Sequence, residues 1–235
     1  MQFSTWIPSP APSDGKGQHE ELWAAFEQNR PVRILVLPAL FEEANTLRRF
    51  TFSLMRALDE AAIDSALPDW PGCHESLAPI TAQTLSSWRA CVNHAAEHFE
   101  ATHIFAVRGG CLLDQTNLPS WHYAPVDGGK LLAGMMRAQA IAEREAGRSE
   151  TRETLLERAR IDGISLAGWA LGAEMVLELE AASPVQSSSK AVVDQAELDG
   201  AGLWLRAEPS EDANQTAALA KIIIDAVAPD QAIEP

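Results

Sequence analysis

The residues that most suggest chemistry lie between positions 101 and 113, in the stretch ATHIFAVRGGCLL. Ala106 and Gly110 place small residues two positions on either side of a central residue, as in the G-x-S-x-G turn that holds out a nucleophilic serine. The central residue here is Arg108, followed by Gly109. A guanidinium stays protonated and cannot attack a carbonyl group. The spacing therefore predicts the sharp turn of a serine-dependent enzyme without its nucleophile.

A catalytic histidine is also missing from the part of the chain where such an enzyme needs one. A Ser-Asp-His triad on a parallel sheet takes its histidine from a loop late in the chain, after the last strand. The last of the six histidines is His122, and the late loop PSEDAN offers only carboxylates and an amide. Asp194, Glu197 and Asp199, near the usual position of a triad acid, have no imidazole to orient. We therefore expect no conventional ester hydrolysis.

Three roles remain open for Arg108. The turn is expected to precede a helix, whose N-terminal N–H groups favour anions, so the guanidinium needs a negative partner there. Glu42 or Glu43, after the first buried strand, could form a bidentate ion pair with Arg108 and fill the vacated site. Alternatively, Arg108 binds an anionic ligand such as a carboxylate, phosphate or uronate, with Asn45 as an orienting donor. The third role is in unconventional catalysis.

Unconventional catalysis would need another nucleophile, and Cys111 is the nearest candidate. A position in the first helical turn and a neighbouring guanidinium would both lower the pKa of its thiol. The protein would then be a carboxylester hydrolase or an acyltransferase. A residue three positions past the turn usually packs into the helix, however, so a buried structural cysteine is the competing interpretation.

A second loop, PDWPGCHES at residues 68–76, has the spacing D-x-x-G-x-x-x-S that is common in α/β hydrolases. It places Asp69 at the end of a predicted strand. Asp69, His74, Glu75 and Asp127 lack any recognised metal-ligand spacing, so we interpret them as caps and solvated turns. The stretch VDGGK lacks the spacing of a phosphate-binding loop. We therefore expect neither a metal site nor a cofactor.

The elements that must position these residues alternate between strand and helix, which predicts an α/β domain with a mostly parallel sheet and helices on both faces. The predicted domain covers residues 31–228, with a small helical insertion at about 130–182. Residues 1–30 are expected to form an extension with an irregular lead-in and a short amphipathic helix around EELWAAFEQ, and residues 229–235 a frayed tail. The stretch AGLWLRAE is a further strand candidate, followed by a closing helix at 214–227.

Composition limits the partners. The net charge is −15, from 18 basic and 33 acidic residues, which disfavours binding to nucleic acid. No stretch approaches the ~18 apolar residues of a membrane span, and the N-terminus lacks a secretion-signal pattern. The three cysteines are widely spaced without a C-x-x-C pair, which favours a reducing cytoplasm over disulfides or zinc.

The stretches PALFEEANTLRRF, PDWPGCHES, AVRGG and APVDGGKLLAGMMRAQAIAE together resemble the exosortase A system-associated hydrolases of the second type. The likeness runs from about residue 31 to 182, and its most specific part is E-E-x-N-x-x-R-R, from Glu42 to Arg49. It implies an α/β-hydrolase fold, an arginine at the turn and an association with exopolysaccharide and protein-sorting systems. This chain departs from the pattern at Ala106, where the family has glycine. The sequence thus favours a pseudoenzyme that binds an anionic small molecule or a protein partner near Arg108.

Overall fold

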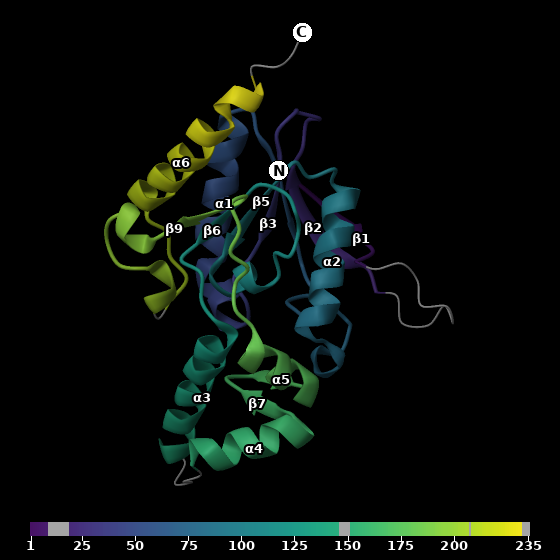
Figure 1. The fold of residues 1–235 in the computed structure, drawn as a ribbon, viewed down its shortest axis with the longest axis vertical. Coiled ribbons are helices and arrows are strands. Elements are labelled where there is room, and N and C mark those ends of the chain that lie inside the picture. Colours follow the sequence, from purple (N-terminus) through teal and green to yellow (C-terminus); the bar gives the residue numbers. More distant parts are fainter. Residues whose placement is uncertain (9–18, 146–150, 207, 232–235) are drawn as a thin grey trace.

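A seven-stranded sheet organises the chain (Figure 1). The computed structural model describes residues 1–8, 19–145, 151–206 and 208–231. The strands lie in the order β1-β2-β4-β3-β5-β6-β9. Their bounds are β1 Gln2–Trp6, β2 Glu21–Phe26, β3 Arg33–Leu37, β4 Asp64–Pro68, β5 His103–Val107, β6 Ser120–Tyr123 and β9 Lys190–Val193. Strands β4, β3, β5, β6 and β9 pair in parallel and β1 and β2 antiparallel, which confirms the mostly parallel sheet.

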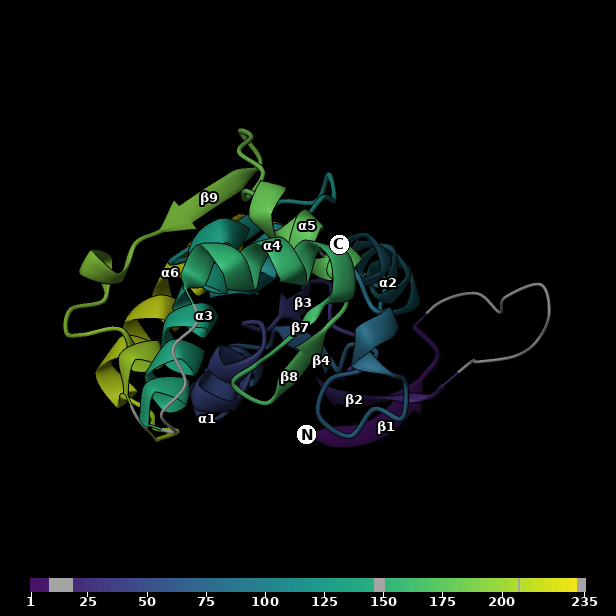
Figure 2. The ribbon, with the colours of Figure 1, turned by 90° about the horizontal axis from the view of Figure 1, so that it is seen from below.

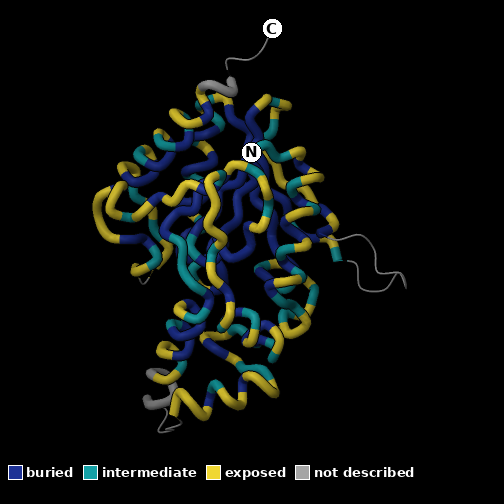
Figure 3. Tube along the Cα trace, viewed as in Figure 1, coloured by how far each residue is buried: buried dark blue, intermediate teal, exposed yellow. Residues whose placement is uncertain are grey.

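The central strands are apolar on both faces because helices cover both. All five residues of β3 and all five of β5 are buried. Within β5, Ile104 and Ala106 belong to one hydrophobic cluster, whereas Phe105 and Val107 belong to the other. This period of two distributes a continuous apolar run over two cores, as a strand inside a parallel sheet requires. Figure 3 shows the strands as the most deeply buried part of the chain.

Two layers of helix enclose the sheet. Helix α1 (Glu42–Glu60) packs beside α6 (Ala213–Gln231) on one face, and α2 (Leu85–His98) covers the other (Figure 1). The apolar stripe of α1 includes Leu47, Phe50, Leu54 and Leu58, all fully buried. Thr84 caps the start of α2, since its hydroxyl accepts a hydrogen bond from the Ser87 N–H in a capping box.

An insertion between β6 and β9 lies across the edge of the sheet where the parallel strands end (Figures 1 and 2). It comprises α3 (Gly128–Glu145), α4 (Arg152–Asp162), the hairpin β7 (Ile164–Leu166) and β8 (Trp169–Leu171), and α5 (Ala173–Ala181). Helix α3 packs against α5. The insertion expected at about 130–182 is therefore mostly helical, with a hairpin that the sequence did not predict. The insertion faces the carboxyl end of β5, which Arg108 directly follows.

The N-terminal region differs from its prediction. The short helix expected around EELWAAFEQ is strand β2, and part of the expected irregular lead-in is strand β1; residues 9–18 lie outside the described residues. Trp23 and Ala25 pack into one core and Ala24 and Phe26 into the other. An apolar run that is buried on both sides suits a strand as well as a helix, and the antiparallel pairing with β4 decides the outcome.

Two predictions near the C-terminus also need correction. The strand expected at AGLWLRAE is instead a single 3₁₀ turn, η4 (Leu203–Leu205), so β9 is the last strand at this edge among the described residues. The closing helix runs to Gln231, past the expected start of the tail at 229. Residues 232–235 lie outside the described residues.

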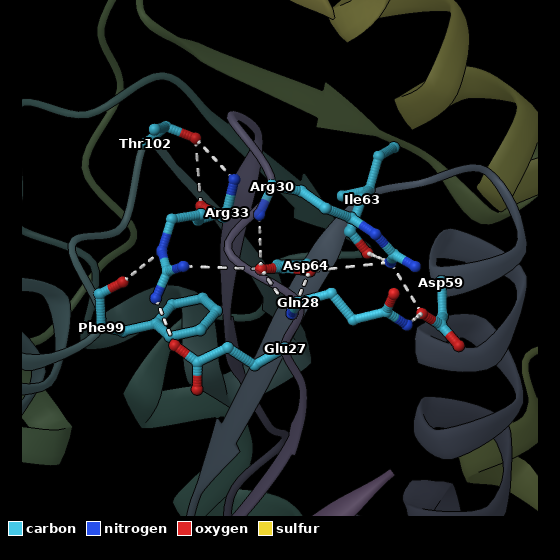
Figure 4. A network of polar contacts seen from close by, with 9 residues as sticks. All are labelled: Glu27, Gln28, Arg30, Arg33, Asp59, Ile63, Asp64, Phe99 and Thr102. Atoms are coloured by element: carbon cyan, nitrogen blue, oxygen red, sulfur yellow. Dashed lines mark hydrogen bonds and ion pairs between the residues drawn. The ribbon is translucent and has the colours of Figure 1, made fainter.

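The opposite, amino-terminal edge of the sheet is fixed by a charged network (Figure 4). The buried carboxylate of Asp64 accepts hydrogen bonds from the backbone N–H groups of Gln28 and Arg30, each at 3.0 Å, and from Arg33 Nη1 at 3.4 Å. Arg33 Nε donates to the Phe99 carbonyl oxygen at 2.7 Å. The network thereby ties the starts of β3 and β4 to the loop before β3 and to the end of α2.

Candidate functional site

The predicted turn is present at the end of β5, with Arg108 in its central position. Arg108 has φ 52°, a left-handed conformation that is strained for a residue with a side chain. A Cβ atom on Gly110 would lie 2.3 Å from the Pro38 carbonyl oxygen, so only glycine fits where the turn meets the end of β3. A Cβ atom on Gly109 would lie 3.1 Å from Leu40 and Leu131 side-chain atoms. The small residues at the turn thus follow from steric crowding.

The helix expected behind the turn is much shorter than predicted. Residues Arg108–Leu112 form only the five-residue 3₁₀ helix η2, which leads through a loop directly into β6. A helix of this length has almost no macrodipole. The charge of Arg108 must therefore be balanced by side chains and carbonyl groups rather than by an anion bound at a helix N-terminus.

Arg108 is engaged on several sides. Its Nε donates to Glu43 Oε2 at 3.1 Å and its Nη2 to Glu43 Oε1 at 2.9 Å, forming a bidentate pair. Its Nη1 donates to the Ala124 carbonyl oxygen at 3.1 Å, and the guanidinium carbon lies 4.2 Å from the centre of a Trp204 ring. Of the two carboxylates considered from the sequence, Glu43 makes this pair. Glu42 is exposed beside it.

The start of α1 explains the position of Glu43. Phe41, with φ 57°, turns the chain sharply after β3, and α1 begins at Glu42. Both glutamates therefore lie in the first helical turn, where the free N–H groups stabilise negative charge. Phe41 itself is buried against Trp88 and Trp169, which fixes the direction of the helix entry. Glu43 is thus held toward the turn at the end of the neighbouring strand.

A cavity of about 310 Å³ lies beside the Arg108–Glu43 pair. Its walls come from the start of α1, from one face of α3, from the tip of the β7–β8 hairpin and from η4. The lining residues are Leu40, Phe41, Glu42, Glu43, Arg108, Val126, Lys130, Leu131, Gly134, Met135, Arg137, Ala138, Ala167, Trp204 and Leu205. Among these described residues there is no serine, threonine, cysteine or histidine. The cavity has the size of a small-molecule site, and its lining lacks both a hydroxyl or thiol nucleophile and a histidine base.

Cys111 is poorly placed to act as a nucleophile. Its side chain is fully buried, and its Sγ donates to the Ala106 carbonyl oxygen at 3.4 Å. Burial raises the pKa of the thiol far above its usual range, and the nearby Asp114 raises it further, whereas Arg108 lowers it only in part. The reactive thiolate is therefore disfavoured. The geometry matches the structural interpretation of this cysteine.

The sequence-predicted residues Asn45 and Asp69 lie apart from Arg108. Asn45 lines a second cavity of about 280 Å³ together with His74 and Trp169, on the other side of the β7–β8 hairpin. Asp69 is buried behind it, with Oδ1 3.1 Å from His74 Nδ1 and 3.9 Å from Arg48 Nη1. The structure thus divides the predicted site residues between two cavities: Glu42, Glu43 and Arg108 border the first, and Asn45 the second.

A buried ionic cluster beneath η2 was not predicted from the sequence. Asp114 Oδ2 lies 2.8 Å from His122 Nε2 and accepts a hydrogen bond from Lys190 Nζ at 2.7 Å. All three side chains are almost fully buried. Burial opposes ionisation of Asp114, but hydrogen bonds from His122, Lys190 and Thr116 hold the pKa of this carboxyl well below its usual range. In the sequence, Lys190 ends the polar stretch SPVQSSSK, and single-sequence patterns cannot pair it with a distant aspartate.

An acidic residue, Asp194, lies where a triad acid is expected, but its carboxylate caps a backbone turn. Asp194 follows β9 directly and caps the short helix η3 (Gln195–Glu197) through a capping box. Its own N–H donates to Glu197 Oε1 at 2.7 Å. Next to it, Gln195 accepts a hydrogen bond from the buried Tyr123 hydroxyl. These residues stabilise the turn after β9 and do not orient a base.

The described residues lack two further features, a cluster of metal-ligand side chains and a membrane-spanning helix. No group of three or more His, Cys, Asp or Glu side chains there is close enough to hold a metal ion. None of the described helices is both long and apolar enough to cross a bilayer.

Comparison with solved structures identifies the fold. No family model matches the chain, and no curated protein matches its sequence. Among solved structures, alpha/beta hydrolase domain-containing protein 10 from mouse superposes with a TM-score of 0.55 at 10% identity, covering 97% of this chain and 99% of that one. A hydrolase from Pseudomonas aeruginosa superposes with a TM-score of 0.52 at 12% identity, covering 97% of both chains. This protein therefore has the α/β-hydrolase fold.

Proposed function

We propose that this protein is a hydrolase-fold pseudoenzyme that binds a small anionic molecule in the 310 Å³ cavity beside Arg108 and does not hydrolyse it. The observation that carries the proposal is the bidentate Arg108–Glu43 pair at the turn. It fills the position from which this fold presents its nucleophile, and the cavity lining next to it contains no serine, threonine or cysteine and no histidine base.

The charges around the cavity support an anionic ligand over a cationic one. The negative charge of Glu43 is already compensated by Arg108, and Glu42 is stabilised by the N-terminus of α1. Lys130 and Arg137 add positive charge from α3, and both are exposed. The same cavity could also accept a carboxylate side chain of a protein partner in place of a free small molecule.

The sequence resemblance supports a biological setting. The E-E-x-N-x-x-R-R stretch and the arginine at the turn favour a role beside an exosortase or exopolysaccharide system, in the cytoplasm. All three cysteines are free and buried, which agrees with a reducing compartment. This setting is part of the proposal and rests on the resemblance alone.

The experiment combines a turnover assay with a ligand assay on the purified protein. We expect no hydrolysis of p-nitrophenyl acetate or butyrate and no labelling by a fluorophosphonate. Thermal unfolding should shift upward with glucuronate, phosphate or acetate, because a ligand that binds only the folded state stabilises it. Arg108→Ala should abolish this shift, since it leaves Glu43 facing the cavity as an uncompensated negative charge.

Arg49→Ala is the matched control, because Arg49 pairs with Glu211 on the exposed side of α1. It removes one positive charge away from the cavity and should leave the anion-dependent shift unchanged. Ester turnover by the wild-type protein would contradict the proposal. A shift that survives Arg108→Ala, or that is lost equally in Arg49→Ala, would place anion binding elsewhere.

A further inference from the structure

One wall of the cavity beside Arg108 follows α3. Six of its lining residues lie on this helix, at spacings of one, four, five, seven and eight from Lys130: Lys130, Leu131, Gly134, Met135, Arg137 and Ala138. These spacings describe a single face of a helix. At 1.5 Å per residue, the stripe extends about 12 Å along the helix axis. A groove of this shape suits a chain better than a compact, branched molecule.

Gly134 marks the middle of this groove. It lies inside α3, where glycine is unfavourable relative to alanine. No close neighbour requires it, because the nearest atom to an added Cβ would be Arg137 Nη2 at 3.9 Å. By contrast, an added Cβ on Gly128 or Gly110 would collide with backbone atoms. The glycine at 134 thus leaves open space in the groove without serving any packing contact.

The groove is apolar along its length and positive on the α3 side. Leu131 and Met135 lie next to Gly134, while Leu40 and Phe41 come from the opposite wall. Lys130 pairs with Asp127 at 2.9 Å, but its side chain is 77% exposed, so a ligand can compete for it. Arg137 forms no ion pair with any described residue, and it borders both the groove and the space above Gly134.

Because Arg108 is already held by Glu43, Ala124 and Trp204, the ligand's charge needs another partner. We propose that the groove along α3 binds an unbranched aliphatic carboxylate, with its chain over Gly134 and its carboxylate on Arg137. This assignment rests on the proposed function and names its ligand class and its charge-binding residue. Lys130 adds a second, weaker positive charge at the other end of the stripe.

Calorimetric titration with octanoate tests the assignment. Octanoate should bind at least about tenfold more tightly than 1-octanol, and octyltrimethylammonium should bind more weakly than either. Across butanoate, hexanoate and octanoate, each added methylene should tighten the Kd by up to about fourfold, as burial of an apolar chain predicts. Equal affinity for octanoate and octyltrimethylammonium, or no dependence on chain length, would overturn the assignment.

Variants on α3 separate the two contacts. Arg137→Gln should lower octanoate affinity to that of 1-octanol, and Arg137→Lys should restore most of it. Gly134→Leu should abolish binding of both ligands by filling the groove, while its better helix propensity preserves the fold. Ala140→Leu is the matched control: Ala140 lies on the exposed part of α3 outside the lining, and octanoate binding should remain. Retention of octanoate affinity in Gly134→Leu would overturn the assignment.

The outcomes distinguish this assignment from the proposed function. If glucuronate or phosphate stabilises the protein and octanoate does not bind, the chain-binding groove is wrong and the anion-binding pseudoenzyme stands. If p-nitrophenyl esters are hydrolysed and octanoate inhibits them competitively in wild type but not in Gly134→Leu, the pseudoenzyme is wrong and the groove stands.

Discussion

Arg108 and Glu43 lie 65 positions apart in the sequence, yet they meet through two parallel hydrogen bonds of 3.1 and 2.9 Å at the edge of the sheet. One comes from the turn after β5 and the other from the first turn of α1. The pair joins the ends of two adjacent parallel strands where this fold builds its catalytic centre. The pair therefore acts as a structural clamp between the two strand ends.

The clamp predicts a specific pattern of stability. Arg108→Ala should lower the free energy of unfolding by about 2–3 kcal/mol, less than for a fully buried pair because both side chains keep some exposure. The double variant Arg108→Ala/Glu43→Ala should recover part of this loss. Urea denaturation of the four proteins in the cycle should give a coupling energy of about 1–2 kcal/mol. Additive single effects would show that the pair contributes nothing as a unit.

A serine at position 108 should not produce hydrolysis. Arg108→Ser returns the hydroxyl to the turn, but no described residue that lines the cavity is a histidine that could take its proton. Turnover of p-nitrophenyl butyrate by this variant should equal that of Arg108→Ala, which lacks both the guanidinium and the hydroxyl. Faster turnover by the serine variant would reveal a base that the geometry does not show.

The buried Asp114 cluster should control acid stability. The folded-state pKa of Asp114 lies below the unfolded value of about 3.9, so the ionised carboxylate stabilises the fold above that pH. This contribution is lost as the pH falls from about 4 toward the folded-state pKa. Asp114→Asn should therefore be destabilised at pH 7 and lose less stability than wild type on acidification to pH 3, as measured by urea denaturation.

Lys190 tests the same cluster from its cationic side. Lys190→Met should cost about 3–5 kcal/mol at pH 7, because it leaves a buried carboxylate without its ammonium partner. The control is Lys221→Met, which breaks an exposed pair with Asp225 and should change stability by less than about 0.5 kcal/mol. Similar losses of unfolding free energy in the two variants would mean that the buried Asp114–Lys190 pair contributes no more to stability than an exposed pair.

The thiols should be unreactive in the folded protein. Burial raises the pKa of Cys91 to about 12, and burial raises those of Cys73 and Cys111 further. At pH 8 an aromatic disulfide reagent should label none of them within minutes, and all three after unfolding in guanidinium chloride. Rapid native labelling that disappears in Cys111→Ala would revive the alternative in which this thiol is the nucleophile.

The fold was largely predictable because its signals are local. Continuous apolar runs marked β3 and β5, helical periodicity marked α1 and α2, and the steric demands of the turn marked Gly110. The N-terminal strand β2 was mistaken for a helix because a short apolar run fits both periods. Its pairing with β1 and with β4, whose partner residues lie 39 to 45 positions away, makes it a strand.

The candidate site was only partly predictable. The charge of Arg108 required an acidic partner, and the strand order brought Glu42 and Glu43 near it, but the sequence could not choose between them. The choice depends on the entry angle of α1, which Phe41 sets through its strained backbone. Trp204 escaped notice because its segment looked like a strand, and the pairing of Asp114 with Lys190 spans 76 positions.

Consider finally the 3₁₀ turn at Leu203–Leu205, which takes the place of the last strand and holds Trp204 over the Arg108 guanidinium. In hydrolases of this fold, the histidine of the triad comes from a loop late in the chain, after the last strand. Here the segment at Leu203–Leu205 instead packs the Trp204 ring against the Arg108 guanidinium. A serine placed at position 108 would therefore need a rerouted segment to supply its base, and we expect that substitutions at the turn alone do not produce an esterase.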